Sequence, residues 1–448
     1  MFGTDGIRGK ANKYPMLPDI ILKLGKAAAL YFKTNSKSKT GRVIVGKDTR
    51  LSGYIFENAI TAGLLAMGKE VFLLGPVPTP SLAFLTKSMR ADFGIMITAS
   101  HNPYYDNGIK IFDSDGFKLN HNKELEIESL IKSDLSNALT VADKVGRALR
   151  LRGVEGRYLQ HAKSIFPREI DLSDLRIVVD CANGAAYKIA PDVLYELRAK
   201  EIITLGVTPN GTNINDNCGS TYINNTVNKV LEVGADVGIS FDGDADRLIM
   251  VDEKGNVLDG DIILGIIANY WQEQGLLRGN AVVGTIVSSL GLERFLTSKG
   301  INLKRVNVGD KNIIDYMRKH NLNLGGEASG HTVLLDFNSN SDGILACLEV
   351  LKIMLIKGVS LSSLGALFKK VPQSVNNLEV PYDILSDEVV DNFISKIIEN
   401  NKNKARIIVR KSGTENKVRI LVEGDDIGYI RTLSEEINFY LKNYVMQL

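Results

Sequence analysis

The chain has 448 residues, of which 44% are hydrophobic and 24% charged. This composition is typical of a soluble globular protein and gives room for about three domains of roughly 150 residues each. The net charge is only +2, from 54 basic and 52 acidic residues, so no excess of positive charge indicates a nucleic-acid or membrane partner. The first residues, MFGTDGIRGKANKYP, contain no apolar targeting segment, and no run approaches the roughly 20 apolar residues of a membrane span. A cytoplasmic enzyme is therefore expected.

The chain contains three cysteines, Cys181, Cys218 and Cys347. They are widely spaced and form no CxxC pair, so the sequence indicates neither a disulfide framework nor a zinc site. Cys347 stands in the apolar run GILACLEVLKIML and is expected to be a core thiol on a helix.

In chain order, a strand, a loop of small or polar residues and a helix recur three times. The runs are GRVIVGKDTRLSGYIFENAITAGLLAMG from residue 41, LRIVVDCANGAAYKIAPDVLYEL from residue 175 and NAVVGTIVSSLGLERFLTSKG from residue 280. Each is typical of the start of a βαβ unit. The repetition predicts three similar mixed α/β domains.

The last part of the chain follows a different pattern. A strand LEVPYDI, a helix DEVVDNFISKIIENN, an antiparallel strand pair in ARIIVRKSGTENKVRILVEG and a final helix predict a smaller α+β domain. Changes in composition near residues 150, 251 and 370 suggest domains at 1–150, 151–250, 251–369 and 370–448. We expect an active-site cleft between the four.

Residues 98–110, TASHNPYYDNGIK, place Ser100 and His101 in a turn-rich loop. The apolar run ADFGIMI before them predicts a buried strand, and Pro103 and the Asn107-Gly108 turn break regular structure after it. Ligand and catalytic groups gather at strand ends of open α/β sheets. The alternative is a serine that caps the N-terminus of a helix.

The run DGDADR, residues 242–247, carries three aspartates at alternate positions. A calcium loop of the EF-hand type is excluded, because Arg247 stands where that loop needs glycine and the flanks GADVGISF and RLIMV are strands. Carboxylates this close repel one another unless a cation or donors compensate them. Magnesium prefers such hard oxygen ligands. An acidic surface turn is the alternative.

Two further loops suit a phosphorylated sugar. In GGEASGH, residues 325–331, Glu327 and Ser329 offer a carboxylate and a hydroxyl to a polyol, with His331 nearby. In RKSGTENKVR, residues 410–419, basic side chains flank a Ser-Gly-Thr turn whose N–H groups and hydroxyls can bind a phosphate. A charged hairpin tip is the alternative for this second loop.

The four loops are regularly spaced along the chain. Ser100, Asp242, Glu327 and Ser412 are 142, 85 and 85 residues apart, so each predicted domain contributes one loop. Together the loops supply a nucleophile, a metal site, a sugar-binding group and a phosphate-binding group. Phosphoryl transfer on a sugar phosphate needs these parts.

The motifs TASHNP, DGDADR, GEASGH and the RxSGTE turn, in this order, resemble those of the α-D-phosphohexomutases over essentially the whole chain. The resemblance implies a phosphoserine enzyme that works through a sugar bisphosphate with bound Mg²⁺. The start FGTDGIRGKAN, the VGDK loop at 308–311 and LLDFNSNSDG are most similar to members that interconvert glucosamine 6-phosphate and glucosamine 1-phosphate. That reaction supplies the route to UDP-N-acetylglucosamine, a cell wall precursor.

The resemblance also implies roles for individual residues. Ser100 would be the phosphoserine, and its oxygen would bind Mg²⁺ together with Asp242, Asp244 and Asp246, beside which Arg247 lies. The remaining roles are proton transfer and charge stabilisation by Lys110, His101, Arg8 and His331, sugar binding by Glu327 and Ser329, and phosphate binding by Arg410, Ser412, Gly413, Thr414 and Arg419.

Some positions depart from the resembling members. Ala328 stands where glutamine is usual, Lys311 where arginine is usual, and Lys411 and Asn416 replace prolines. These departures leave the hexose preference open. A phosphomannomutase or phosphoglucomutase is the nearest alternative, a metal-dependent sugar phosphatase is a second, and a non-enzymatic sugar-phosphate sensor is a third. The oligomeric state also stays open, a homodimer included.

Overall fold

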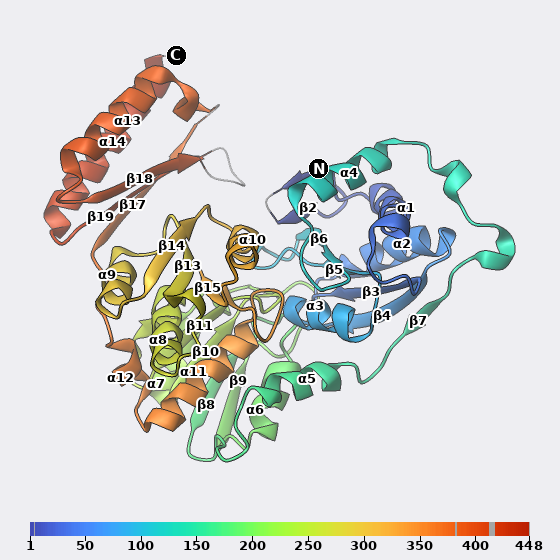
Figure 1. Cartoon of the computed structure of the whole chain (residues 1–448), viewed down its shortest axis with the longest axis horizontal. Helices are drawn as coiled ribbons and strands as arrows, with labels where there is room; N and C mark the ends of the chain where they lie inside the picture. Colours follow the sequence, from blue (N-terminus) through green and yellow to red (C-terminus); the bar gives the residue numbers. More distant parts are fainter. Residues whose placement is uncertain (4, 381–382, 412–416, 448) are drawn as a thin grey trace.

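The structure is a computed structural model that describes residues 1–3, 5–380, 383–411 and 417–447. Within these ranges the chain forms four sheets, of seven, five, four and three strands. Each sheet and its helices make one domain, and we number the domains first to fourth in chain order (Figure 1). Three similar mixed α/β domains and a smaller C-terminal domain are thus present, as predicted. The boundaries given above stay predictions.

The first domain contains β1 (Phe2–Gly3), β2 (Gly6–Lys10), α1 (Pro18–Asn35), β3 (Arg42–Lys47), α2 (Gly53–Ala66), β4 (Glu70–Pro76), α3 (Thr79–Ser88), β5 (Phe93–Ile97), β6 (Asp106–Asp113), α4 (His121–Lys132), the short 3₁₀ turns η1 (Ser136–Ala138) and η2 (Ala142–Lys144), and β7 (Ala148–Arg150). Its strand order is β1-β2-β6-β5-β3-β4-β7. Because side chains alternate along a strand, Val43 and Val45 of β3 join the core under α1 and α2, whereas Ile44 joins the core under α3. Helices therefore cover both faces of this sheet.

The second domain contains α5 (Glu155–Ser164), β8 (Arg176–Asp180), α6 (Ile189–Glu196), β9 (Glu201–Leu205), α7 (Asn224–Val233), β10 (Val237–Phe241), β11 (Leu248–Asp252) and β12 (Val257–Leu258). Strand β8 lies parallel to both β9 and β10, so the loops that follow β8 and β10 meet at one edge of the sheet. They approach so closely that a Cβ on Gly184 would lie 2.4 Å from the carbonyl oxygen of Gly243.

The third domain contains α8 (Gly260–Glu273), η3 (Arg278–Asn280), β13 (Ala281–Thr285), α9 (Leu290–Ser298), β14 (Asn302–Val306), α10 (Asp310–His320), β15 (Leu324–Gly326), β16 (Thr332–Leu334), α11 (Gly343–Lys357) and α12 (Leu361–Gly365). Residues of β8, β10, α8 and α11 belong to one hydrophobic cluster, so the second and third domains share a core. Cys347 of α11 is buried in that core, as predicted.

The fourth domain contains β17 (Gln373–Glu379), η4 (Ile384–Ser386), α13 (Glu388–Asn401), β18 (Arg406–Lys411), β19 (Lys417–Glu423) and α14 (Ile427–Gln447). The antiparallel pairing of β18 with β19 confirms the predicted strand pair. The strand expected at LEVPYDI was placed wrongly, because β17 begins earlier, at Gln373, and ends at Glu379. β17 is defined by its pairing with β19, from Gln373 opposite Glu423 to Glu379 opposite Lys417, and it contains only two apolar residues, Val375 and Leu378. Pro381 and Tyr382 of the expected strand lie outside the described residues.

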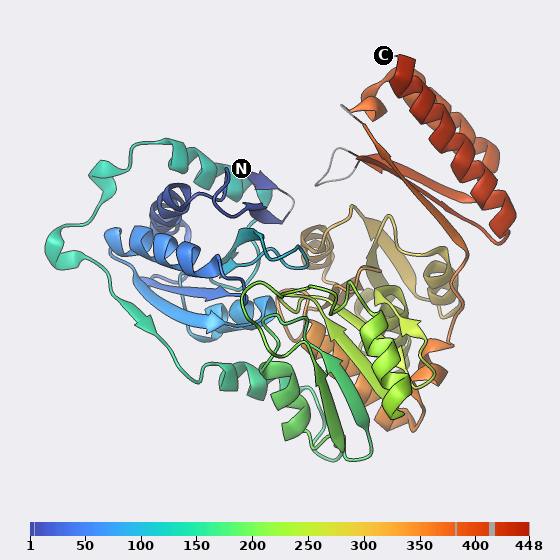
Figure 2. The same ribbon diagram turned by 180° about the vertical axis from the view of Figure 1, so that it is seen from behind.

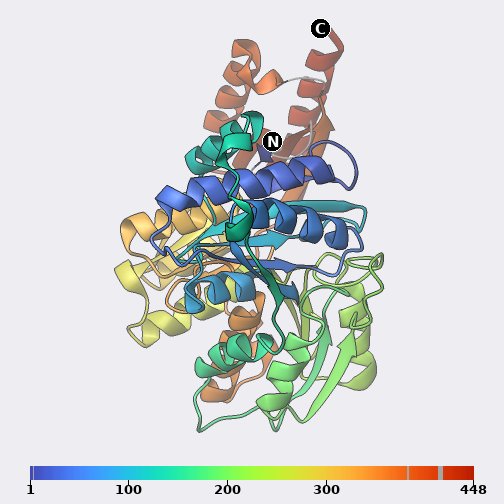
Figure 3. The ribbon, with the colours of Figure 1, turned by 90° about the vertical axis from the view of Figure 1, so that its right-hand side faces the viewer.

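The fourth domain lies at one end of the molecule in all three views and has a hydrophobic core of its own (Figure 1, Figure 2 and Figure 3). The segment between α4 and α5, which carries β7, runs along the outside of the first domain (Figure 2). No helix in the described part of the chain is both long and apolar enough to cross a membrane.

Ion pairs join domains that are distant in sequence. Lys118 of the first domain donates to Asp310 Oδ2 of the third over 2.7 Å, and Lys311 donates to Glu124 Oε2 over 2.8 Å. The guanidinium of Arg294 in the third domain pairs with both carboxylate oxygens of Asp425 in the fourth, at 2.6 and 3.1 Å. Lys311, one of the departures noted above, thus binds a carboxylate of the first domain.

Candidate active site

Ser100 lies on the loop between β5 and β6, at the carboxyl end of the β5 strand, and is buried. Its φ of 51° places it in the left-handed region, which a residue with a Cβ adopts only when its surroundings hold it there. Its Oγ donates to Asp242 Oδ2 of the second domain over 2.6 Å. The helix-cap alternative is wrong, because the next helix begins at His121.

The three aspartates lie on the loop between β10 and β11 and are all buried. One carboxylate oxygen from each of Asp242, Asp244 and Asp246 lies within 4.8 Å of the others. Burial, and then the charges of Asp246 and Asp244, raise the pKa of Asp242 to about 7. An exposed acidic turn is therefore excluded.

The donor set fits a metal ion that prefers oxygen ligands. Among the described residues, Asp244 Oδ1 has no hydrogen-bond partner, although it is buried. An orphaned buried carboxylate oxygen is costly unless a cation lies beside it. The Ser100 hydroxyl adds a fourth oxygen next to Asp242. These residues are thus consistent with a divalent metal site.

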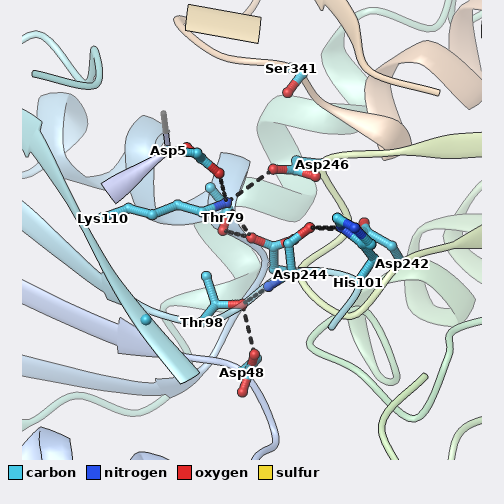
Figure 4. Close-up of polar contacts among 12 residues, drawn as sticks. Asp5, Asp48, Thr79, Thr98, His101, Lys110, Asp242, Asp244, Asp246 and Ser341 are labelled. Atoms are coloured by element: carbon cyan, nitrogen blue, oxygen red, sulfur yellow. Dashed lines mark hydrogen bonds and ion pairs between the residues drawn. The ribbon is translucent and has the colours of Figure 1, made fainter. Parts of the chain in front are cut away.

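Lys110 of β6 lies against the same carboxylates (Figure 4). Its Nζ lies 2.9 Å from Asp244 Oδ2, 3.2 Å from Asp246 Oδ2 and 3.2 Å from Asp5 Oδ2. Although burial disfavours the ammonium form, Asp244, Asp5 and Asp246 raise the pKa of Lys110 well above its ordinary value. Arg8 of β2 also contacts this group, because its Nη2 lies 2.5 Å from Asp5 Oδ2. Two cations thus border the aspartate loop.

His101 and His331 flank the aspartate loop in different electrostatic surroundings. Nδ1 of His101 lies 3.5 Å from Ser100 Oγ, and burial together with Arg247 and Arg8 lowers the pKa of His101 to about 3. Although burial opposes it, Asp246 and Glu327 raise the pKa of His331 to about 10. The surroundings of His101 therefore favour its neutral form, whereas the carboxylates around His331 favour its charged form.

Glu327 and Ser329 lie on the turn between β15 and β16 of the third domain. Ser329 Oγ donates to Glu327 Oε2 over 3.0 Å, and the backbone N–H of Gly309 donates to Oε1 over 2.6 Å. His331 Nδ1 lies 3.2 Å from Glu327 Oε2, while its Nε2 lies 3.2 Å from both Asp246 Oδ1 and Arg247 Nε. His331 therefore links the proposed sugar loop to the aspartate loop.

The phosphate-binding prediction falls on the fourth domain. Arg410 and Arg419 are opposite one another on β18 and β19. Ser412, Gly413 and Thr414 lie outside the described residues. Burial and the charge of Arg419 lower the pKa of Arg410, whereas Glu327 of the third domain acts in the opposite direction. Arg410 is thus within electrostatic reach of the Glu327 loop.

Three residues that contact the aspartates or cations of the site were not predicted. Thr79, at the start of α3, donates its Oγ1 to Asp244 Oδ2 over 2.6 Å (Figure 4). Asp5 accepts from Lys118 over 2.7 Å in addition to its contacts with Lys110 and Arg8. The position of Asp5, three residues before Arg8, could have indicated that Asp5 belongs to the site. Nothing in the local sequence indicates that Thr79 or Lys118 does.

Four family models match the chain in order. They are described as the phosphoglucomutase/phosphomannomutase alpha/beta/alpha domain I over residues 1–138, domain II over 156–255, domain III over 259–371 and the C-terminal domain over 369–438. Together they cover most of the chain.

Solved structures share the fold. A phosphoglucomutase/phosphomannomutase family protein from Burkholderia thailandensis has a TM-score of 0.80 at 22% identity, with 99% of this chain and 97% of that chain covered. The N-acetylphosphoglucosamine mutase of Aspergillus fumigatus, in complex with GlcNAc-6P and magnesium, has a TM-score of 0.70 at 17% identity, with 99% and 96% covered.

Curated relatives are more similar to this chain in sequence than these two solved structures are. The phosphoglucosamine mutase of Rhizobium johnstonii is 49% identical over 97% of this chain and 96% of its own length. The phosphoglucosamine mutase of Bartonella quintana is 51% identical over 95% of this chain and 92% of its own length. With four family models matched in order and identity near one half over nearly the whole length, the chain belongs to the phosphoglucomutase/phosphomannomutase family of phosphohexomutases.

Proposed function

We propose that this chain is a phosphoglucosamine mutase that interconverts glucosamine 6-phosphate and glucosamine 1-phosphate. The observation that carries the proposal is the buried contact of 2.6 Å between Ser100 Oγ and Asp242, where a hydroxyl of one domain meets the carboxylate triad of the next. The names of the full-length relatives support the choice of amino sugar. Asp242, Asp244 and Asp246 would hold Mg²⁺ with an oxygen on Ser100, and the ion would offset negative charge on the phosphoryl group.

In the proposed reaction, phospho-Ser100 gives its phosphoryl group to the free hydroxyl of the bound sugar phosphate. The bond between Ser100 Oγ and phosphorus breaks, a bond between the sugar oxygen and phosphorus forms, and the proton that the sugar hydroxyl loses ends on the freed Ser100 Oγ. We assign the proton transfers and the charge on the moving group to Lys110 and His101, with Arg8 and His331. The position of Lys110 suits the charge role, because its Nζ lies 2.9 Å from Asp244 Oδ2, in the carboxylate group that Ser100 Oγ contacts.

The product of this step is a sugar 1,6-bisphosphate. It must turn over and return its other phosphate to Ser100, so the group that holds the non-reacting phosphate has to accept either end of the sugar. We assign this role to Arg410 and Arg419 with Ser412, Gly413 and Thr414. Glu327 and Ser329 would hold sugar hydroxyls between the two phosphate positions, since Arg410 lies within electrostatic reach of Glu327.

The test is a coupled assay with glucosamine 6-phosphate, Mg²⁺ and a trace of a hexose 1,6-bisphosphate. We expect glucosamine 1-phosphate as the main product and a higher kcat/KM than with mannose or glucose phosphates. Faster turnover of mannose or glucose phosphate would instead identify a phosphomannomutase or phosphoglucomutase. Release of inorganic phosphate as the main product would identify a sugar phosphatase.

Arg410→Ala is expected to raise KM for glucosamine 6-phosphate by at least about tenfold, since each hydrogen bond to a charged group contributes roughly 1.5–3 kcal/mol and about 1.4 kcal/mol is tenfold. We expect a smaller fall in kcat, because the lost contact also orients the sugar. Arg410→Lys should recover part of the loss, since a point charge lacks the planar fork of the guanidinium. Steady-state kinetics measure these effects.

Lys402→Ala is the control for Arg410→Ala, because Lys402 is an exposed cation of the same domain that pairs with Glu399 after the end of α13. Both constants of this control should match the wild type. If Arg410→Ala also matched it, the RKSGTENK turn would be a charged hairpin tip.

A further inference from the structure

A loop of the second domain reaches across to the serine loop of the first. Asn215, between β9 and α7, donates its Nδ2 to the carbonyl oxygen of Ser100 over 2.9 Å and to that of Asn102 over 3.1 Å. The backbone N–H of Asn215 donates to Ala182 over 2.9 Å, which ties this loop to the end of β8. The second domain therefore fixes the backbone of Asn215, and the side-chain amide contacts the serine loop from that fixed position.

Arg50 of the first domain contacts the same two carbonyl groups from within its own domain. Its fully buried Nη2 donates to Ser100 O and to Asn102 O, both over 2.8 Å. Its Nε donates to Asp48 Oδ2 over 2.8 Å, and Asp48 also accepts from Thr98 Oγ1 over 2.7 Å (Figure 4 shows the Thr98 contact). Each of the two carbonyl oxygens thus accepts from one donor in each domain.

These contacts bear on where the Ser100 hydroxyl points. Ser100 has the left-handed φ of 51°, which is unfavourable for a residue with a Cβ, so it needs fixed bonds on both sides of its Cα. On the amide side, Ser100 N donates to Thr98 Oγ1 over 2.9 Å. On the carbonyl side, Arg50 and Asn215 supply the fixed bonds.

The aspartate loop packs directly on the same contacts. A Cβ on Gly243 would lie 2.6 Å from Ser100 O and 2.9 Å from Asn215 Nδ2. Gly243 stands between Asp242 and Asp244, so the loop with the carboxylates lies too close to the serine loop to admit a side chain at this position. The carbonyl contacts therefore set the spacing between Ser100 Oγ and the aspartate triad.

We infer that Asn215 and Arg50 are positioning residues for phosphoryl transfer at Ser100, and that Asn215 couples the nucleophile of the first domain to the carboxylates of the second. The inference rests on the proposed function, because it assigns these residues to the step in which Ser100 accepts and donates the phosphoryl group. Neither side chain needs to touch the sugar.

Asn215→Asp tests this inference, because the substitution keeps size and shape but replaces the N–H donors with an oxygen that faces two carbonyl oxygens. The matched control is Asn217→Asp in the same loop. Asn217 is exposed and, like Asn215, has a positive φ, which aspartate tolerates as asparagine does. The measurements are kcat, KM, Tm and the rate at which glucose 1,6-bisphosphate phosphorylates Ser100. Intact-protein mass spectrometry measures that rate.

For Asn215→Asp we expect kcat and the rate of Ser100 phosphorylation to fall at least tenfold, with KM within twofold of the wild type. Asn217→Asp should match the wild type in kcat, KM and the rate of Ser100 phosphorylation, with only a small fall in Tm because the exposed bond from Asn217 Nδ2 to Asp216 Oδ1 is lost. If Asn215→Asp lowers Tm markedly, Asn215→Gly decides, because it permits the positive φ and adds no charge; the same split between kcat and KM is expected. An active wild type with unchanged kcat in the stable Asn215 variant would overturn the inference, whereas an inactive wild type would overturn the proposed function.

Discussion

Ser100→Ala is expected to reduce the isomerisation of glucosamine 6-phosphate by at least about a thousandfold, which is roughly 4 kcal/mol of activation free energy. Alanine has no oxygen to which the phosphoryl group can transfer, so the covalent route is closed. The protein should stay folded. Leaving Asp242 without this donor costs about 1–3 kcal/mol, less than the stability of a typical domain.

Two measurements check the Ser100 prediction. Intact-protein mass spectrometry of the wild type should show a fraction with one added phosphate, and this fraction should rise after incubation with a hexose bisphosphate. Ser100→Ala should show none, while Ser133→Ala, which removes an exposed hydroxyl at the end of α4, should behave as the wild type. If the wild type gained no phosphate even with the bisphosphate, the covalent scheme would be wrong.

Asp244→Asn is expected to weaken Mg²⁺ binding and lower activity by at least about a hundredfold. Loss of a residue that only hydrogen-bonds to a metal ligand already costs about 10–100-fold in metal affinity or activity, and Asp244 is proposed as a ligand itself. The substitution removes an anionic oxygen from the triad and disturbs the contacts of Asp244 with Thr79 and Lys110. Titration calorimetry with Mg²⁺ measures the affinity directly. The control is Asp174→Asn, which neutralises an exposed carboxylate before β8.

Removal of the metal gives a second test of the same site. Excess chelator should abolish the activity of the wild type, and added Mg²⁺ should restore it. Full activity in excess chelator would remove the metal from the proposed mechanism. Equal Mg²⁺ affinity in Asp244→Asn and Asp174→Asn would place the ion elsewhere.

Local patterns in the sequence were sufficient to predict the loops of the site. Ser100 follows an apolar run that forms β5, and the aspartates follow one that forms β10, so strand periodicity placed both at strand ends. Four motifs in order then identified the family. The roles of these residues in catalysis stay predictions.

The contacts that hold the loops were not predictable from one sequence. Asn215 meets the carbonyl of Ser100 across 115 residues, and Lys118 meets Asp310 across 192. The sequence around Asn215 and Lys118 does not indicate these contacts, because asparagine in a polar loop and lysine beside a turn are common at protein surfaces. Their roles arise only when the domains pack. The strand expected at LEVPYDI was wrong for a related reason, since β17 is fixed by its pairing with β19 and not by its own apolar content.

The ion pairs at the two domain junctions differ in their exposure to solvent. Lys118 and Asp310, between the first and third domains, have side chains that are 7% and 5% exposed, whereas Arg294 and Asp425, between the third and fourth, are 51% and 75% exposed. Dissolved ions screen the interaction between exposed charges, with a Debye length of about 8 Å at physiological ionic strength and a shorter one at higher salt, whereas buried pairs are screened much less. Rising salt concentration should therefore weaken the Arg294–Asp425 pair more than the Lys118–Asp310 pair, so the domain that carries the proposed phosphate-binding residues should respond to ionic strength more than the junction between the first and third domains.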